Sequence, residues 1–148
     1  MTTALINPQE VAINRNKIAA IKVEVKKLPQ LNIELSHHFA DRVYGREGTI
    51  PAGSITVARI HKQSQIQILL TGSMSMFTET GMTKIVAPCV WVAPAGIERT
   101  TFYHEDTRRV TIIGTEEVDP VVIFNTCTEE TYQDYLLSSE EVLKLKDN

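Results

Sequence analysis

The sequence has few of the residues that characterise disulfide-rich and metal-bound scaffolds. Its 148 residues contain only 2 cysteines. Cys89 and Cys127 are far apart and show neither CxxC nor Cys/His spacing, so the sequence indicates neither a disulfide framework nor a zinc knuckle. We expect both cysteines to pack as small hydrophobic residues rather than to act as nucleophiles.

Long hydrophobic runs and an excess of one charge are also absent. No run approaches the roughly 18–20 apolar residues of a membrane helix, and the N-terminal MTTALINPQE lacks the pattern of a secretion signal. The 15 basic and 18 acidic side chains give a formal net charge of −3, which offers no electrostatic surface for nucleic acid or an anionic membrane. We therefore expect a cytosol-like compartment, with neither a nucleic-acid nor a membrane partner.

Catalytic signatures are missing as well. The chain contains no GxGxxG, GxxxxGK[ST], GxSxG or HExxH motif and no internal repeat. Its composition, 43% hydrophobic and 22% charged, is that of an ordinary globular domain. The sequence therefore predicts one compact core and assigns no catalytic residue.

Residues 1–30 differ in pattern from the rest and form a predicted N-terminal arm. Ile18, Ile21, Val25 and Leu28 recur at helical spacing, and Pro29 ends the segment. The many β-branched residues leave an added strand as the alternative to a helix. The four apolar residues are candidates for contacts with a neighbouring subunit, and the alternative is that the arm folds onto its own domain.

Residues 31–126 consist of short apolar-alternating runs separated by turn residues. The breaks fall at Gly45, 51–53, Gly72, Gly81 and 94–96, a spacing typical of a β-sandwich or a closed barrel. No long helix interrupts them, which excludes a parallel α/β sheet. Residues 127–148 form a tail with a short helix over SSEEVLKLKDN, in which Ser138 and Glu141 match a capping box.

Two stretches of the barrel resemble the sequence motifs of the cupin superfamily, whose members are small jelly-roll β-barrels. At the positions of the first motif the chain has Gly53, Arg59, His61, Gln65 and Gly72. At those of the second it has Pro94, Gly96, Arg99 and Tyr103. The resemblance therefore implies a mainly β, cupin-like barrel, with the glycines and Pro94 at tight corners between strands.

Metal-binding cupins hold their ion with three histidines and a carboxylate, and this chain departs from that set. His61 is the one histidine kept, while Arg59 and Arg99 take two ligand positions. A protonated guanidinium has no lone pair to donate and repels a cation, and the Gln65 amide is a weak ligand. We therefore expect no metal and no cofactor.

The candidate pocket residues are Arg59, His61, Gln65, Arg99 and Tyr103. In the cupin register, Arg59 and Arg99 approach one pocket and could hold a carboxylate, a phosphate or a sugar through forked hydrogen bonds. The alternative is that each arginine pairs with a nearby acid such as Glu47 or Glu98, or faces a neighbouring subunit. Of the adjacent His37 and His38, only one can face inward, where it could reach His61.

A narrower resemblance, over residues 37–117, is to the short cupin-like proteins of tailed bacteriophages. It is carried by HHFADRVYGREGTIPAGSITVARIHK, by the later APCVWVAPAGIER, and by YHEDTRRVTI. It implies a non-catalytic structural protein of the head, neck or tail, made in the host cytoplasm and located in the virion with other virion proteins as partners. Because small barrels must cover apolar strands, we also expect a homo-oligomer. The alternatives are a metal-dependent or sugar-binding cupin enzyme using His61, and a small-molecule-binding accessory protein.

Overall fold

The computed structural model describes residues 7–146, so residues 1–6 of the predicted arm and residues 147–148 of the predicted tail lie outside the described residues. In chain order, the helices are α1 (Pro8–Lys26), α2 (Pro120–Cys127) and α3 (Tyr132–Lys146). The strands are β1 (Leu35–Ala40), β2 (Val43–Ile50), β3 (Ile55–Val57), β4 (Ile60–His61), β5 (Gln65–Thr71), β6 (Ser73–Thr78), β7 (Gly81–Val86), β8 (Cys89–Ala93), β9 (Arg99–Tyr103), β10 (Thr107–Gly114) and β11 (Thr128–Glu129). The prediction of a mainly β chain without a parallel α/β sheet is confirmed.

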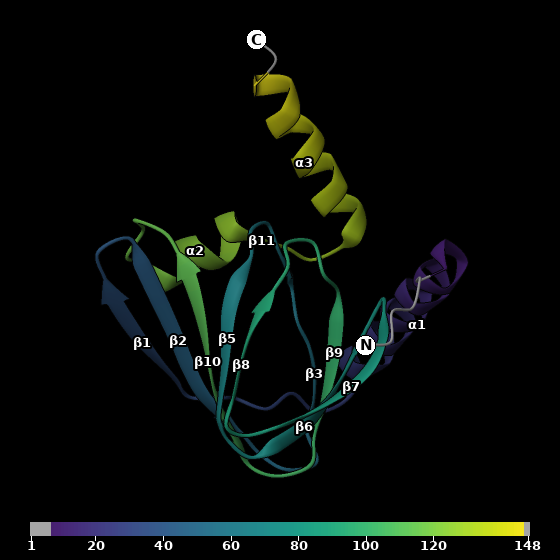
Figure 1. Ribbon diagram of the computed structural model, residues 1–148, viewed down its shortest axis with the longest axis vertical. Coiled ribbons are helices and arrows are strands. Elements are labelled where there is room, and N and C mark those ends of the chain that lie inside the picture. The colour runs from purple at the N-terminus through teal and green to yellow at the C-terminus, as the bar shows by residue number, and fades with distance from the viewer. Residues whose placement is uncertain (1–6, 147–148) are drawn as a thin grey trace, which may run out of the picture.

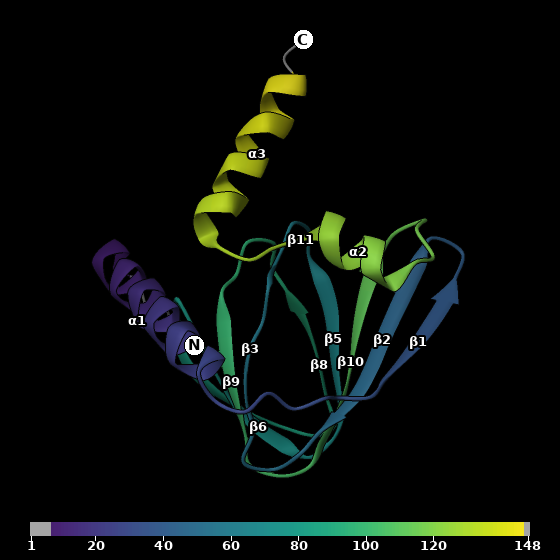
Figure 2. The same ribbon diagram turned by 180° about the vertical axis from the view of Figure 1, so that it is seen from behind.

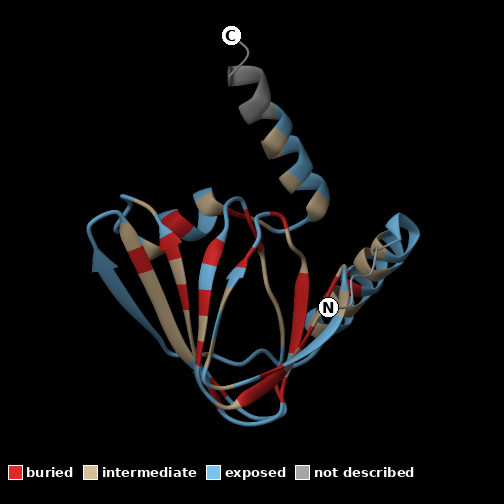
Figure 3. Ribbon diagram, viewed as in Figure 1, coloured by how far each residue is buried: buried red, intermediate tan, exposed pale blue. Residues whose placement is uncertain are grey.

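Two antiparallel sheets form the body of the molecule. The larger sheet has the order β1-β2-β10-β5-β8 and the smaller has the order β3-β9-β6-β7, while β4 and β11 form a separate pair. The two sheets face each other, converge at one end and diverge towards α2 (Figure 1). Most of the buried residues belong to the strands of the two facing sheets (Figure 3). The side chains buried between the sheets therefore include the interior polar residues described below.

Two apolar clusters hold the body together, one at each end. At the narrow end, the buried residues are Ile50, Leu69, Met74, Met76, Ile85 and Tyr103, with Trp91 packed against them. At the wide end, Ile123 of α2 packs on Tyr44 and Ile113 of the larger sheet. Between the clusters, polar side chains line the interior. This is unusual, because a core with a purely structural role is normally apolar.

Two of the turn glycines are required by close packing. Gly72, between β5 and β6, has a φ of 93°, and a Cβ there would lie 2.4 Å from Thr107 Oγ1. Gly96 has a φ of 78°, and a Cβ there would lie 2.6 Å from the Tyr135 ring. Both positions combine a left-handed backbone with no room for a side chain, as the sequence analysis expected.

Helix α1 lies against the outside of the smaller sheet (Figure 2), where it contacts β3, β6 and β9. Ile18 is only 2% exposed, Ile21 and Val25 are half-buried, and Leu28, just beyond the helix, is exposed. The helical alternative is confirmed. The assignment of Ile18 to a contact with a neighbour is wrong, because its side chain is buried within its own chain.

Polar contacts also fix α1 to the rest of the chain. Asn14 Nδ2 donates to the Glu79 carbonyl at 2.8 Å, and Arg15 forms an ion pair with the Glu79 carboxylate. Near the C-terminal end of the helix, Lys26 Nζ lies 2.5 Å from Glu130 Oε1, and Lys22 donates to the Glu130 carbonyl. The N-terminal arm is thus tied to segments that follow it by more than sixty residues.

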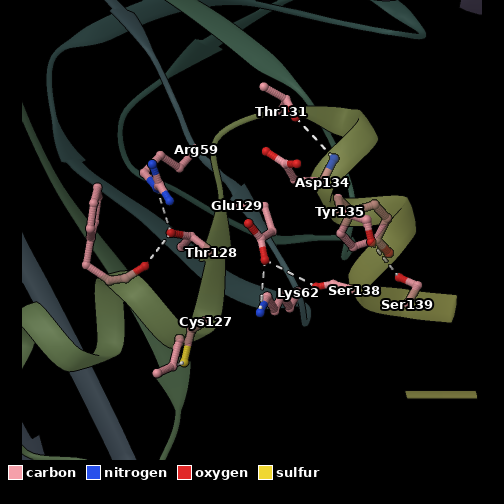
Figure 4. Close-up of polar contacts among 12 residues, drawn as sticks. Arg59, Lys62, Cys127, Thr128, Glu129, Thr131, Asp134, Tyr135, Ser138 and Ser139 are labelled. Carbon is pink, nitrogen blue, oxygen red and sulfur yellow. Dashed lines mark hydrogen bonds and ion pairs between the residues drawn. The ribbon is translucent and has the colours of Figure 1, made fainter. Parts of the chain in front are cut away.

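The C-terminal part differs from the predicted one in two ways. The run after Val118, assigned to the barrel, forms helix α2, which Asp119 caps by accepting from Val121 N at 2.9 Å. The final helix begins at Tyr132 rather than at Ser138, because Thr131 Oγ1 accepts from Asp134 N at 3.1 Å (Figure 4). Helix α3 then extends away from the barrel (Figure 1). None of the helices within residues 7–146 is both long and apolar enough to cross a membrane.

Shortening Ile18 tests whether α1 packs on its own chain. We expect Ile18→Ala to lower the free energy of unfolding by about 2–4 kcal/mol, because it opens a cavity beneath the helix. Ile13→Ala, at an exposed position of the same helix, should change it by no more than about 0.5 kcal/mol. Urea unfolding of both variants measures the difference, and equal effects would contradict the packing.

Candidate anion-binding site

Three arginines lie between the two sheets. Side chains alternate along a strand, so Tyr44, Arg46 and Ile50 of β2 share the inner face. Arg109 and Thr111 of β10 share it too, because Gly48 pairs with Arg109 and Arg46 pairs with Thr111 in the antiparallel register. The facing sheet contributes Arg99, which begins β9. Strands from both sheets therefore bring guanidinium groups into one space.

These arginines line a cavity of about 210 Å³. Its other polar lining residues are Thr56, Thr101, Tyr103 and Thr111, and its aliphatic lining residues are Ile33, Leu35, Ile50 and Ala58. No lining residue is acidic. The cavity is therefore positively charged, with hydroxyl groups that can donate or accept hydrogen bonds.

Arg109 is held in place by its neighbours. Its Nη1 donates to Tyr103 Oη at 2.8 Å, and its Nη2 donates to Gln67 Oε1 at 2.9 Å. Gln67 Oε1 also accepts from Thr111 Oγ1 at 2.9 Å, and Tyr103 Oη lies 3.2 Å from Thr56 Oγ1. This network fixes the guanidinium of Arg109 and leaves its charge uncompensated, because every partner is neutral.

Arg46 and Arg99 have no such partners. In the described part of the chain, no hydrogen bond or ion pair is found for either guanidinium; Arg99 is only 4% exposed, and Arg46 is partly buried. Burial, together with the charges of Arg109 and Arg46, lowers the pKa of Arg99 to about 10. Burial also lowers the pKa of Arg46. At neutral pH both remain charged, with hydrogen-bond donors available to the cavity.

His61 is kept neutral by the same surroundings. It is 5% exposed, and its Nδ1 is buried without a hydrogen-bond partner. Burial, and then the charges of Arg99, Arg46 and Arg109, lower its pKa to about 3. A fourth positive charge is thereby avoided beside the three arginines.

The other predicted pocket residues fall into two places. Tyr103 lines the cavity with Arg99. Gln65 is buried nearby, but its amide is used internally: Nε2 donates to the Gln63 carbonyl at 2.5 Å, and Oε1 accepts from Gln67 Nε2 at 3.4 Å. Gln65 therefore supports the wall rather than a ligand.

Arg59 lies outside the cavity, so the expectation that it shares a pocket with Arg99 is wrong. Its Nε donates to Thr128 Oγ1 at 2.8 Å (Figure 4), and its guanidinium carbon lies 4.4 Å from the centre of the Phe124 ring. The physical reason is the break between β3, which ends at Val57, and β4, which begins at Ile60. The alternation of side chains does not carry through that break.

His37 and His38 do not reach His61 either. His37 Nδ1 lies 2.5 Å from Tyr44 Oη, and His38 Nε2 lies 3.5 Å from Glu47 Oε1. All of β1, an edge strand, is exposed. Glu47 also pairs with Arg108 at 2.8 Å on the outer face, so it compensates an outer arginine and none in the cavity.

The residues of the site do not fit a metal ion. Across residues 7–146, no group of three or more His, Cys, Asp or Glu side chains is placed to hold one. The positive charges of Arg99, Arg46 and Arg109 act on His61 instead, and they would repel a cation there. The chemistry of the donors favours an anion.

Arg46, Gln67 and Arg109 contribute to the site but were not among the predicted pocket residues. Their signal lies in strand alternation: Arg46 stands between Tyr44 and Gly48 on one face of VYGREGTI, and Arg109 stands two residues before Thr111 in RRVTIIG. A charged residue in the inward phase of a strand indicates a buried functional charge.

The chain has no match among protein-family models, and none among curated protein sequences. Structural comparison does find relatives of the fold. KdgF from Halomonas sp. aligns with a TM-score of 0.51 at 12% identity, over 62% of this chain and 92% of that one. An RmlC-like cupin with a double-stranded β-helix fold from Methanocaldococcus jannaschii aligns with a TM-score of 0.50 at 8% identity, over 57% and 82% of the two chains.

A protein from Neisseria meningitidis aligns similarly, with a TM-score of 0.50 at 9% identity, over 64% of this chain and 95% of that one. The predicted cupin-like fold is therefore confirmed: the chain is a cupin-type double-stranded β-helix with an added N-terminal helix and a C-terminal helix. At these identities the similarity extends to the fold alone. None of it concerns a virus particle, so the virion role stays a prediction.

The buried histidine predicts a specific pH dependence of stability. His61 has a pKa of about 3 when folded, below the ordinary histidine pKa of 6.5. Between these values the unfolded chain binds one more proton, so stability present above pH 6.5 is lost as the pH falls towards 3. We expect His61→Gln to make the slope of unfolding free energy against pH shallower by about 1.4 kcal/mol per pH unit.

Urea unfolding between pH 6 and 4 measures this slope for both proteins. In the same range, NMR of the folded wild type should show no protonation of the His61 ring. Parallel slopes for the two proteins, or a His61 resonance that titrates above pH 5, would contradict the neutral state.

Proposed function

We propose that this protein binds a small anion inside its barrel. The observation that carries the proposal is the pair Arg46 and Arg99, two charged guanidiniums that line the cavity without an acidic or hydrogen-bonding partner among the described residues. A buried charge without a partner costs several kcal/mol. An anion that enters the cavity supplies the missing partner.

The chemistry of arginine favours carboxylate, phosphate and sulfate. Guanidinium presents five N–H donors in a planar fork that matches two oxygens of such a group. Two unpaired forks and the third charge of Arg109 can surround one anionic head, while Tyr103 and Thr111 sit beside it. This is a binding function, and it corresponds most closely to the small-molecule-binding alternative of the sequence analysis.

Unpaired charge in the cavity predicts that a bound anion stabilises the fold. We expect 10 mM phosphate to raise the melting temperature relative to chloride at equal ionic strength, because a ligand that binds only the folded state shifts unfolding by mass action. Arg99→Met should abolish the shift. Without phosphate, Arg99→Met should melt at or above the wild-type temperature, since an unpaired buried charge has been replaced by an apolar chain of similar length.

The matched control is Arg108→Met, which removes an arginine from the outer face of β10 and should keep the phosphate response. Calorimetric titration of phosphate into the three proteins gives the affinities directly. The proposal fails if phosphate and acetate leave the wild type unchanged, or if Arg108→Met abolishes the response as completely as Arg99→Met.

A second proposal, self-association, is favoured by the outer face of the larger sheet. Two rows of aliphatic residues cross β10, β5 and β8 in register: Val110, Ile68 and Val90 in one row, and Ile112, Ile66 and Val92 in the other. Val90 and Val92 are 66% and 65% exposed, and β8 is an edge strand. A contiguous apolar patch beside an open edge is typical of an interface. Assembly through this patch is also what the predicted structural role in a tailed-phage particle would require.

Introducing a charge into these rows tests the assembly. We expect Ile66→Asp to convert an oligomeric wild type into monomers, because each contact would then bury a carboxylate. Val118→Asp, at a 68% exposed position before α2, should leave the oligomer intact. Sedimentation velocity over a range of concentrations distinguishes them, and a wild type that stays monomeric throughout would overturn the proposal.

A further inference from the structure

A second, larger depression adjoins the arginine cavity. It has a volume of about 850 Å³. One side is formed by the end of α1 and the linker that follows it, and the other side is formed by β3. Its walls include Leu28, Leu31, Ile55 and Phe124, which are 55%, 61%, 43% and 43% exposed. Large apolar side chains that would otherwise be scattered over the surface thus gather in one groove, here called the β3 groove.

The β3 groove and the arginine cavity share a wall. Ile33, Ile50, Thr56 and Ala58 line both. Thr56 also lies 3.2 Å from Tyr103 Oη, within the network that fixes Arg109. Because β3 is the end strand of the smaller sheet, an elongated molecule can pass its free edge, with one end among the arginines and the rest against the apolar walls of the groove.

The charges around the groove fix the direction of such a molecule. Lys22 and Lys26 are bound to Glu130, and Arg59 is bound to Thr128 and lies over the Phe124 ring. Each cation of the groove thus has a hydrogen-bond partner, and Lys26 has a carboxylate, whereas Arg46 and Arg99 in the cavity have neither. An anionic group gains most in the cavity, and an apolar group gains most in the groove.

We infer that the ligand is an amphipathic acid, with a single anionic head held by Arg46 and Arg99 and an aliphatic or aromatic body lying in the β3 groove. This inference rests on the proposed anion-binding function and adds the chemical class of the ligand. The combined space is of the size that suits a small organic ligand. The occupant is one molecule that passes the free edge of β3, which is the end strand of the smaller sheet, with its head in the cavity and its body in the groove.

A series of straight-chain carboxylates tests the inference. Titration calorimetry on the full chain, with acetate, butanoate, hexanoate and octanoate below their micellar concentrations, measures how affinity depends on chain length. We expect about fourfold tighter binding for each methylene that enters the groove. Arg99→Met should weaken every acid of the series.

Ile55→Asp separates the body from the head. We expect it to weaken octanoate binding at least tenfold and to change acetate and phosphate binding less than twofold, because it touches the groove alone. Val118→Asp is the control for an added surface carboxylate. Sedimentation of each protein at the same concentrations shows whether a variant has changed the oligomeric state.

The outcomes distinguish the inference from the function on which it rests. Acetate and phosphate that bind through Arg99, with no gain for longer acids, would overturn the amphipathic ligand and keep the anion-binding function. No binding of any acid would overturn both. Octanoate binding that is unchanged in both Arg99→Met and Ile55→Asp would overturn the inference. An Ile55→Asp effect that accompanies a change of oligomeric state would also overturn it, because the groove would then be a contact between subunits.

Discussion

The barrel encloses positive charge without an internal counter-charge, and the properties of the site follow from this constraint. Arg46, Arg99 and Arg109 share a low-dielectric interior, where like charges repel strongly. Their field, together with burial, keeps His61 neutral. Only Arg109 distributes its donors to neutral partners. The two remaining guanidiniums are left with unused donors, and the proposed anion would supply the partners that the chain does not.

The fold tolerates this charge because its stability comes from elsewhere. One apolar cluster closes the narrow end around Leu69 and Met74, and a second closes the wide end, where Ile123 of α2 packs on the larger sheet. Outside the barrel, Glu79 and Glu130 tie α1 to the body. Binding sites often retain such locally unfavourable arrangements at some expense of stability. The polar cavity is thus flanked by the elements that hold the sheets together.

The turn positions follow from sequence pattern, because turn chemistry is a local property, and the inward place of Arg99 follows from its register in the second cupin-like motif. Arg59 could not be placed this way, since two residues between β3 and β4 interrupt the alternation. Ser138 matched a cap in the sequence, but Thr131 offered an equivalent one seven positions earlier, and the longer helix formed. The packing of Ile18 on its own sheet depends on tertiary contacts that no local pattern encodes.

Arg46 and Arg109 could have been predicted as site residues from their positions along the strands. Each stands among residues that alternate towards the core, and a charge in that phase is costly unless something pairs with it. With Arg99, they give the cavity a positive charge that suits an anion, and they help to keep His61 neutral. The architecture of the barrel sets where a ligand lies, while the sign of a few inward side chains sets what the ligand is. In this chain the inward side chains are positively charged, and an apolar groove lies beside the cavity. The two features together match the anionic head and the apolar body of the inferred amphipathic acid.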